Sequence, residues 1–74
     1  GNNMPLFPVG TILMDRGDLG MIIRYDAKAW MCPYIIEFTS GFKLAFEESE
    51  VREFIYQLED YMVNHYGDGD EATT

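Results

Sequence analysis

The chain has 74 residues and a formal net charge of −8, because five Lys and Arg face 13 Asp and Glu. Its length fits one small domain, and a hydrophobic content of 47% excludes an intrinsically disordered chain. One cysteine and one histidine supply neither a disulfide framework nor the four ligands of a structural zinc site. We therefore expect no metal and no cofactor.

The negative charge is concentrated in the C-terminal part of the chain. Residues 1–46 are neutral in sum, whereas residues 47–74 hold nine carboxylates and one arginine. Such a field opposes binding to nucleic acid and to anionic membranes, and it favours a basic protein partner. No apolar run approaches the roughly 18–20 residues of a membrane span, and no signal peptide is visible. These features predict a soluble protein of a reducing compartment, the cytoplasm.

Residues 1–8 predict an extended N-terminal arm. Gly1-Asn2-Asn3 is typical of a disordered lead-in. The prolines that follow cannot donate to a sheet ladder. Leu6 and Phe7 are costly to leave in water, so we expect the arm to pack on the domain or on a partner.

Four strands are predicted next, at Val9–Met14, Met21–Tyr25, Tyr34–Phe38 and Phe42–Phe46. The last two alternate apolar and polar residues with the period of two that marks a half-buried strand. Short connections rich in Gly, Asp and Ser make sequential strands antiparallel neighbours. In the connection Thr39-Ser40-Gly41 we expect glycine at the left-handed position.

From Val51 the apolar period changes to three and four residues, which predicts an amphipathic helix over 49–66. Ser49 is the expected N-cap and Gly67 the expected terminating residue. Residues 67–74 are acidic and contain two glycines, which predicts a disordered tail. The globular domain is therefore expected over 9–66.

The predicted fold is α+β, with a four- to five-stranded antiparallel β-meander packed against one C-terminal helix. The helix is expected to lie over the sheet. The expected core combines side chains from both layers: Met21, Ile23, Ile36, Phe38, Leu44, Phe46, Val51, Phe54, Ile55, Leu58 and Met62.

The strand pattern also resembles a known family. Val9-Gly10-Thr11-Ile12-Leu13, Leu19-Gly20-Met21-Ile22-Ile23, Tyr34–Phe38 and Gly41-Phe42 are similar to small SH3-like barrels of the KOW and Tudor kind. The resemblance covers roughly residues 9–46 and implies a half-open barrel. It implies binding of peptides, modified side chains or nucleic acids through surface aromatics and loops. It transfers no individual binding residue.

Several patterns that suggest chemistry have simpler explanations. Arg16-Gly17-Asp18 spells an adhesion tripeptide, but it is also the composition of a hairpin turn. Cys32 and His65 are far apart in sequence, and a nucleophile pair needs them to meet. The glutamates of residues 47–53 are typical of a solvated helix start. We therefore expect that the protein is not an enzyme.

The candidate binding residues flank the longest connection, residues 26–33. Tyr25, Trp30 and Tyr34, with Lys28, form the kind of surface that peptide-binding domains use. The alternative is that Trp30 packs into the core. A second candidate surface is the outer helix face that carries Glu50, Glu53 and Asp60.

The function that these features favour is a non-catalytic protein-interaction module or accessory subunit. Two alternatives stay open. One is a nucleic-acid-associated SH3-like domain that uses Arg24, Lys28, Lys43 and Trp30. The other is an acidic decoy of a basic nucleic-acid-binding protein. The single inner face cannot hold all the apolar side chains, among them Ile22, Ile35 and Tyr56, so we also expect a homodimer.

Overall fold

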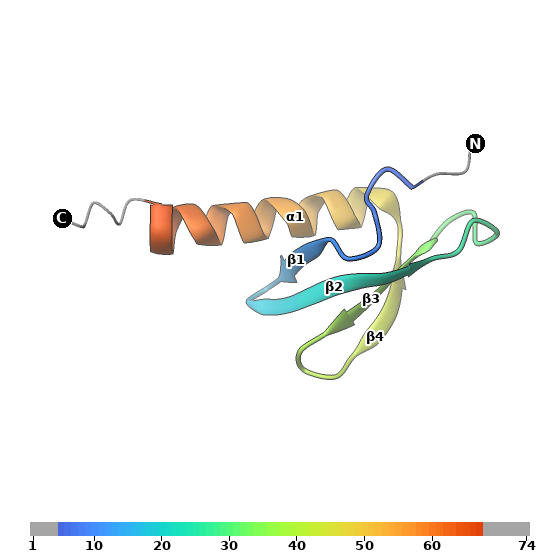
Figure 1. Cartoon of the computed structure of the whole chain (residues 1–74), viewed down its shortest axis with the longest axis horizontal. Coiled ribbons are helices and arrows are strands. Elements are labelled where there is room, and N and C mark those ends of the chain that lie inside the picture. The colour runs from blue at the N-terminus through green and yellow to red at the C-terminus, as the bar shows by residue number, and fades with distance from the viewer. Residues whose placement is uncertain (1–4, 68–74) are drawn as a thin grey trace.

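The computed structural model describes residues 5–67. Within them, four strands precede one helix (Figure 1). The elements are β1 (Ile12–Asp15), β2 (Asp18–Tyr25), β3 (Tyr34–Phe38), β4 (Lys43–Phe46) and α1 (Glu48–Met62), and a π-helical turn (Val63–Gly67) follows α1. The predicted lead-in at 1–3 and most of the predicted tail at 67–74 lie outside the described residues.

The four strands form one antiparallel sheet in the order β1-β2-β3-β4. The predicted α+β meander with one C-terminal helix is therefore confirmed. Among the described residues, β1 pairs only with β2 and β4 only with β3, so the sheet does not close into a barrel.

Two turns explain how the strand boundaries differ from those predicted. Residues Pro8–Thr11 form a turn in which Thr11 N–H donates to the Pro8 carbonyl at 3.1 Å, so β1 begins three residues later than expected. Arg16 and Gly17 both have positive φ, 52° and 87°, the conformation of a two-residue type I′ hairpin turn. Pairing can therefore start at Asp18, three residues earlier than expected. The tripeptide Arg16-Gly17-Asp18 thus lies at a hairpin turn, as its composition predicts. Gly41 also has the expected positive φ, 106°.

The inner face of β2 differs from the prediction. Ile22 is completely buried, whereas Met21 is 40% exposed and lies on the outer face. The register pairs Ile22 with Ile36, and a β-bulge between Ile22 and Arg24 shifts the alternation by one residue. Tyr25 therefore returns to the face of its partner Tyr34. The prediction that Met21 and Ile23 enter the core was wrong, because strict alternation cannot anticipate a bulge.

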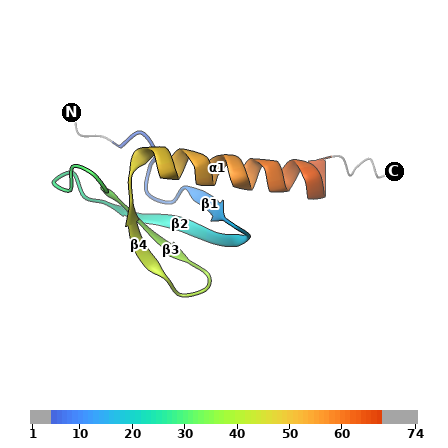
Figure 2. The same cartoon turned by 180° about the vertical axis from the view of Figure 1, so that it is seen from behind.

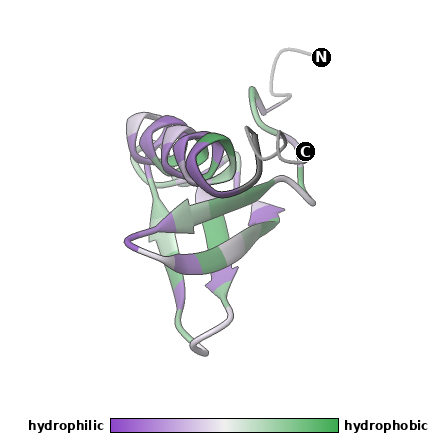
Figure 3. Ribbon diagram, turned by 90° about the vertical axis from the view of Figure 1, so that its left-hand side faces the viewer, coloured by the Kyte–Doolittle hydropathy of each residue, from purple (hydrophilic) through white to green (hydrophobic). Residues whose placement is uncertain are grey.

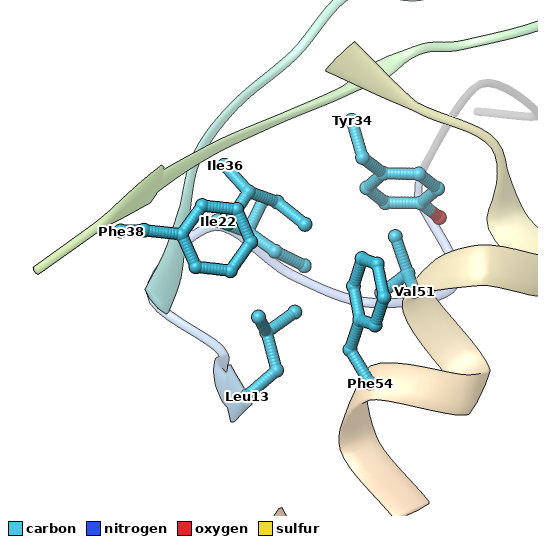
Figure 4. Packing of buried hydrophobic residues seen from close by; sticks show 7 residues of the cluster. All are labelled: Leu13, Ile22, Tyr34, Ile36, Phe38, Val51 and Phe54. Atoms are coloured by element: carbon cyan, nitrogen blue, oxygen red, sulfur yellow. The ribbon is translucent and has the colours of Figure 1, made fainter. Parts of the chain in front are cut away.

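The core lies between the inner face of the sheet and the first half of α1 (Figure 4). Its buried cluster is Leu13, Ile22, Tyr34, Ile36, Phe38, Val51 and Phe54. The ring of Phe54 meets Phe46 and Phe38 edge-on, at centroid distances of 5.0 and 6.3 Å. Gly20 shows how tightly the sheet packs here, because a Cβ at this position would come within 2.7 Å of the Phe38 ring.

The predicted N-cap of α1 was two residues late. Glu47 is the N-cap, and its N–H donates to the Glu50 carboxylate at 3.0 Å, the reach-back contact of a capping box. Ser49 lies inside the first turn. Helical backbone continues through the π turn to Gly67.

α1 runs along β1, and its C-terminal end projects past the β1–β2 hairpin (Figure 1 and Figure 2). The Arg16 N–H at that hairpin donates to Gln57 Oε1 at 2.7 Å, which marks where the helix leaves the sheet. Met62 therefore lies largely exposed, contrary to the prediction that it joins the core. Leu44 on β4 is exposed for a related reason, since α1 covers the opposite edge of the sheet.

The described part of the N-terminal arm packs on the domain. The Tyr34 hydroxyl accepts the N–H groups of Leu6 at 3.1 Å and of Phe7 at 3.4 Å. The Phe7 ring lies 6.0 Å from the Tyr34 ring, and the Arg52 guanidinium lies over it at 5.4 Å. The expected packing of the arm is confirmed at Phe7, whereas Leu6 stays exposed.

Asp18 links the two hairpins of the sheet. Its carboxylate accepts the hydroxyls of Ser40 at 2.6 Å and Thr39 at 2.8 Å, and the Ser40 N–H at 3.3 Å. These hydrogen bonds lower the pKa of Asp18, and the hydrogen bond from the Ser40 hydroxyl contributes most to the shift. A carboxyl whose pKa is lowered by folding stabilises the protein above its unfolded pKa, and this contribution is lost as the pH falls through the folded pKa.

We expect an NMR pH titration of the side-chain carboxyl carbon to place the Asp18 pKa below the usual aspartate value of 3.8. The Ser40→Ala variant removes the first cause of the shift, so the Asp18 pKa should rise toward that value. An Asp18 that titrates at or above 3.8 in the unmodified protein would contradict the contact.

Candidate functional site

The connection between β2 and β3, residues 26–33, is closed at its base. The Asp26 N–H donates to the Pro33 carbonyl at 2.8 Å, and the Asp26 carbonyl and carboxylate accept the N–H groups of Ala29 and Lys28, each at 3.0 Å. Arg24 pairs with the Asp26 carboxylate at 3.6 Å. A connection tied in this way can hold the residues at its tip away from the domain.

Trp30 at this tip is 85% exposed, and the neighbouring Met31 is also exposed. The alternative that Trp30 packs into the core is therefore excluded. Leaving a large aromatic side chain in water forgoes the stabilisation that its burial would give. Exposed aromatic side chains next to a hollow are typical of binding surfaces.

The tip of the connection faces the start of α1 across an open hollow of about 570 Å³. Figure 1 shows both segments at the same end of the molecule. Two segments far apart in sequence line the hollow: Tyr25, Trp30, Met31 and Pro33 on one side, and Glu47, Glu48, Ser49 and Arg52 on the other. We call this hollow the Trp30 site.

The register of the sheet brings these two segments together. Tyr34 pairs with Phe46. Pro33, the residue before β3, therefore lies beside Glu47, the residue after β4. The apolar wall of the Trp30 site therefore meets its acidic wall at the end of the β3–β4 ladder.

The acidic wall is only partly neutralised. Arg52 forms an ion pair with Glu48 at 3.0 Å, four residues earlier on the helix. Within residues 5–67, Glu47 has no basic partner. The Trp30 site thus combines aromatic and apolar surface with an unneutralised carboxylate.

The structure places only some of the predicted binding residues at this site. Tyr25 and Trp30 line it. Lys28 lies exposed in the same connection but does not line the hollow. Tyr34 is buried in the core, where its ring meets Tyr25 edge-on at 5.0 Å. Its predicted place on the surface was wrong, because its hydroxyl is satisfied by the N-terminal arm.

The predicted acidic face of α1 is exposed, but it lies outside the Trp30 site. The Glu50 carboxylate accepts the Glu47 N–H and so takes part in the cap of the helix. Glu53 and Asp60 are exposed and have no basic partner within the described residues.

Sequence reasoning missed the contribution of Glu47, Glu48 and Arg52 to the hollow. The sequence could have indicated this contribution, because pairing the predicted strands 34–38 and 42–46 places Glu47 beside Pro33.

Residues 5–67 contain no group of three His, Cys, Asp or Glu side chains that could hold a metal ion. Cys32 is half-buried, and His65 contacts its own helix, with Nδ1 2.9 Å from the Tyr61 carbonyl. Over residues 5–67, no helix has the length and apolar character needed to cross a bilayer.

Comparison with known proteins identifies no relative: the chain matches no family model, no curated protein and no solved structure.

Proposed function

We propose that this protein is a non-catalytic protein-interaction module that binds a basic segment of a partner protein at the Trp30 site. The observation that carries the proposal is the 85% exposure of Trp30 beside a hollow of about 570 Å³. Trp is enriched among the residues that dominate binding energy at protein interfaces. A partner side chain in the hollow would contact Trp30 and Met31 at the connection and Glu47 at the helix start.

The charge of the helix supports a basic partner. Residues 47–67 carry six carboxylates and one arginine, which pairs with Glu48. Lys or Arg of a partner would be attracted to this field, and Arg also stacks on aromatic faces. Attraction between exposed charges is screened over about 10 Å at 0.1 M salt, so binding is expected to weaken as salt is added.

The direct test uses two short synthetic peptides that differ only in charge, one alternating Arg and Leu and the other alternating Glu and Leu. Affinity is measured by fluorescence anisotropy of the labelled peptides. We expect the basic peptide to bind and the acidic peptide not to bind. Equal affinity for both peptides, or no binding of either, would contradict the proposal.

Substitution of Trp30 should separate binding from stability. Trp30→Ala is expected to weaken binding of the basic peptide by at least about thirtyfold, the scale of a hot-spot residue. Its free energy of unfolding should change by no more than about 0.5 kcal/mol, because the side chain is exposed. Urea denaturation measures the second quantity.

A matched pair of charge-neutralising variants tests the acidic wall. Glu47→Gln removes the carboxylate at the Trp30 site, and Glu59→Gln removes an exposed carboxylate farther along α1. We expect the first variant to weaken binding of the basic peptide more than the second. The reverse order would place the basic partner on the helix face and not at the Trp30 site.

The resemblance to SH3-like domains and the two alternative functions stay predictions. For the nucleic-acid alternative, Arg24 is paired with Asp26, and Lys43 on β4 lies opposite Glu37 on β3. Two of the three basic side chains that it requires therefore lie beside carboxylates, whereas Lys28 is exposed in the connection. No feature of the structure favours the acidic decoy over the basic-segment module.

Self-association is the second part of the proposal. Large apolar side chains outside the Trp30 site remain exposed, among them Phe42 and Leu44 on the β3–β4 hairpin. Burying them against another copy of the chain would remove them from water, which favours a homodimer.

A further inference from the structure

The outer edge of β4 is a free strand edge. Within residues 5–67, β4 ends the sheet order and pairs only with β3. The other edge strand, β1, is flanked by α1, whereas the β3–β4 hairpin extends away from the helix (Figure 3). An uncovered edge strand offers unpaired N–H and C=O groups to another chain.

The inner face of this edge is apolar, and the part of the chain that the structure describes leaves it largely exposed. Phe42 is 64% exposed and Leu44 is 52% exposed. Both lie on the face that carries Ile36 and Phe38, because Leu44 pairs with Ile36 and the Phe38 N–H donates to the Phe42 carbonyl at 2.8 Å. The core therefore continues onto β4, where α1 does not cover it.

The same hydrogen bond fixes which backbone groups point outward. In an antiparallel ladder, hydrogen-bonded and non-hydrogen-bonded pairs alternate. Phe42, Leu44 and Phe46 therefore direct their N–H and C=O groups to β3. Lys43 and Ala45 direct theirs to the free edge, where no described residue receives them.

We propose that a second copy of the chain pairs with β4 through this edge, antiparallel and about a twofold axis at Leu44. Lys43 of each copy then exchanges hydrogen bonds with Ala45 of the other, and the two Leu44 side chains meet at the centre of the inner face. Phe42 of each copy lies opposite Phe46 of the other. Every cross-strand pair on that face is apolar.

The two neighbouring symmetric registers are less favourable. A shift toward the hairpin places Lys43 opposite Lys43 of the other copy, and like charges directly opposite each other are destabilising. A shift toward the helix requires the Glu47 N–H, which already donates to the Glu50 carboxylate. Residues 39–46 contain no carboxylate, so the acid of α1 does not oppose the contact directly.

This inference rests on the proposed self-association and names its surface. The test first measures the mass of the full chain by sedimentation velocity over a range of concentrations, which should show a dimer. Leu44→Glu should raise the dimer dissociation constant by at least about thirtyfold, because two carboxylates would meet at the axis. The matched control is Ile12→Glu, at a similarly exposed position on the outer face of β1, and it should leave the dimer unchanged.

Cross-linking tests the register. In a Cys32→Ser background, Leu44→Cys should oxidise to a disulfide-linked dimer, because residues directly opposite each other in a non-hydrogen-bonded pair have Cβ atoms about 4.5–5.5 Å apart. Ala45→Cys in the same background should cross-link poorly, since the two residues at position 45 lie diagonally across the interface and not directly opposite each other.

The outcomes are distinguishable. A monomer at every concentration overturns both the self-association and the β4 interface. A dimer that is lost with Ile12→Glu but kept with Leu44→Glu leaves the self-association standing and overturns the β4 interface. A dimer that is lost with Leu44→Glu and cross-linked by Leu44→Cys supports both.

Discussion

Replacing Phe54 with alanine is expected to lower the free energy of unfolding by about 3–5 kcal/mol. Phe54 is the helix side chain whose ring meets both Phe38 and Phe46 edge-on, and it is buried. Its removal leaves a cavity between the two layers at the point where α1 joins the sheet. Urea denaturation followed by circular dichroism measures the loss.

Two further variants give the control for this prediction. Tyr56→Ala removes an exposed aromatic side chain from the same helix and should cost about 0.5 kcal/mol or less. Phe54→Leu keeps most of the buried volume and should cost about 1 kcal/mol, which keeps the effect measurable if Phe54→Ala does not fold. Equal losses for Phe54→Ala and Tyr56→Ala would contradict the packing of α1.

Replacing Ile36 with alanine should cost about 2–5 kcal/mol. Ile36 is completely buried on the central strand β3, where it pairs with Ile22 on one side and Leu44 on the other. A cavity at this position cannot be filled by solvent-facing side chains, since the neighbouring groups are fixed by the sheet. The same denaturation experiment measures it.

The adjacent residue gives a matched control for Ile36. Ile35 has the same side chain but lies on the outer face of β3, where it is only partly buried. Ile35→Ala should cost about 1 kcal/mol, because much of its surface already contacts water. If the two variants were equally destabilising, the assignment of inner and outer faces would be wrong.

Regular periodicity predicted the elements of this fold well. The alternation of apolar and polar residues around Ile36 and Phe38 predicted the correct bounds and inner face of β3. The three-to-four-residue spacing of Val51 and Phe54 identified the buried side of the helix. These signals succeed because each depends only on residues close together in sequence.

The errors arose where structure departs from a regular period or depends on distant contacts. The bulge after Ile22 reversed the expected face of the first half of β2. The exposure of Met62 depends on where the β1–β2 hairpin ends, which the helix sequence does not encode. Tyr34 was expected on the surface because it borders a long connection, but the N-terminal arm covers it.

The candidate site could be predicted only in part. The composition of residues 26–33 indicated an aromatic surface at Tyr25 and Trp30. The acidic wall comes from Glu47 and its neighbours, which the β3–β4 pairing brings beside Pro33. Extending the predicted pairing of strands 34–38 and 42–46 by one residue would have placed Glu47 beside Pro33. The exposure of Trp30, in contrast, is evident only from the three-dimensional structure.

The most direct test of the proposed function is the fluorescence of Trp30, the single tryptophan of the chain. The free protein should emit at the wavelength of a water-exposed indole, and the peptide of alternating Arg and Leu should shift the emission toward the blue and saturate. Emission that is already blue-shifted in the free protein, or that does not change at saturating basic peptide, would contradict an open Trp30 site.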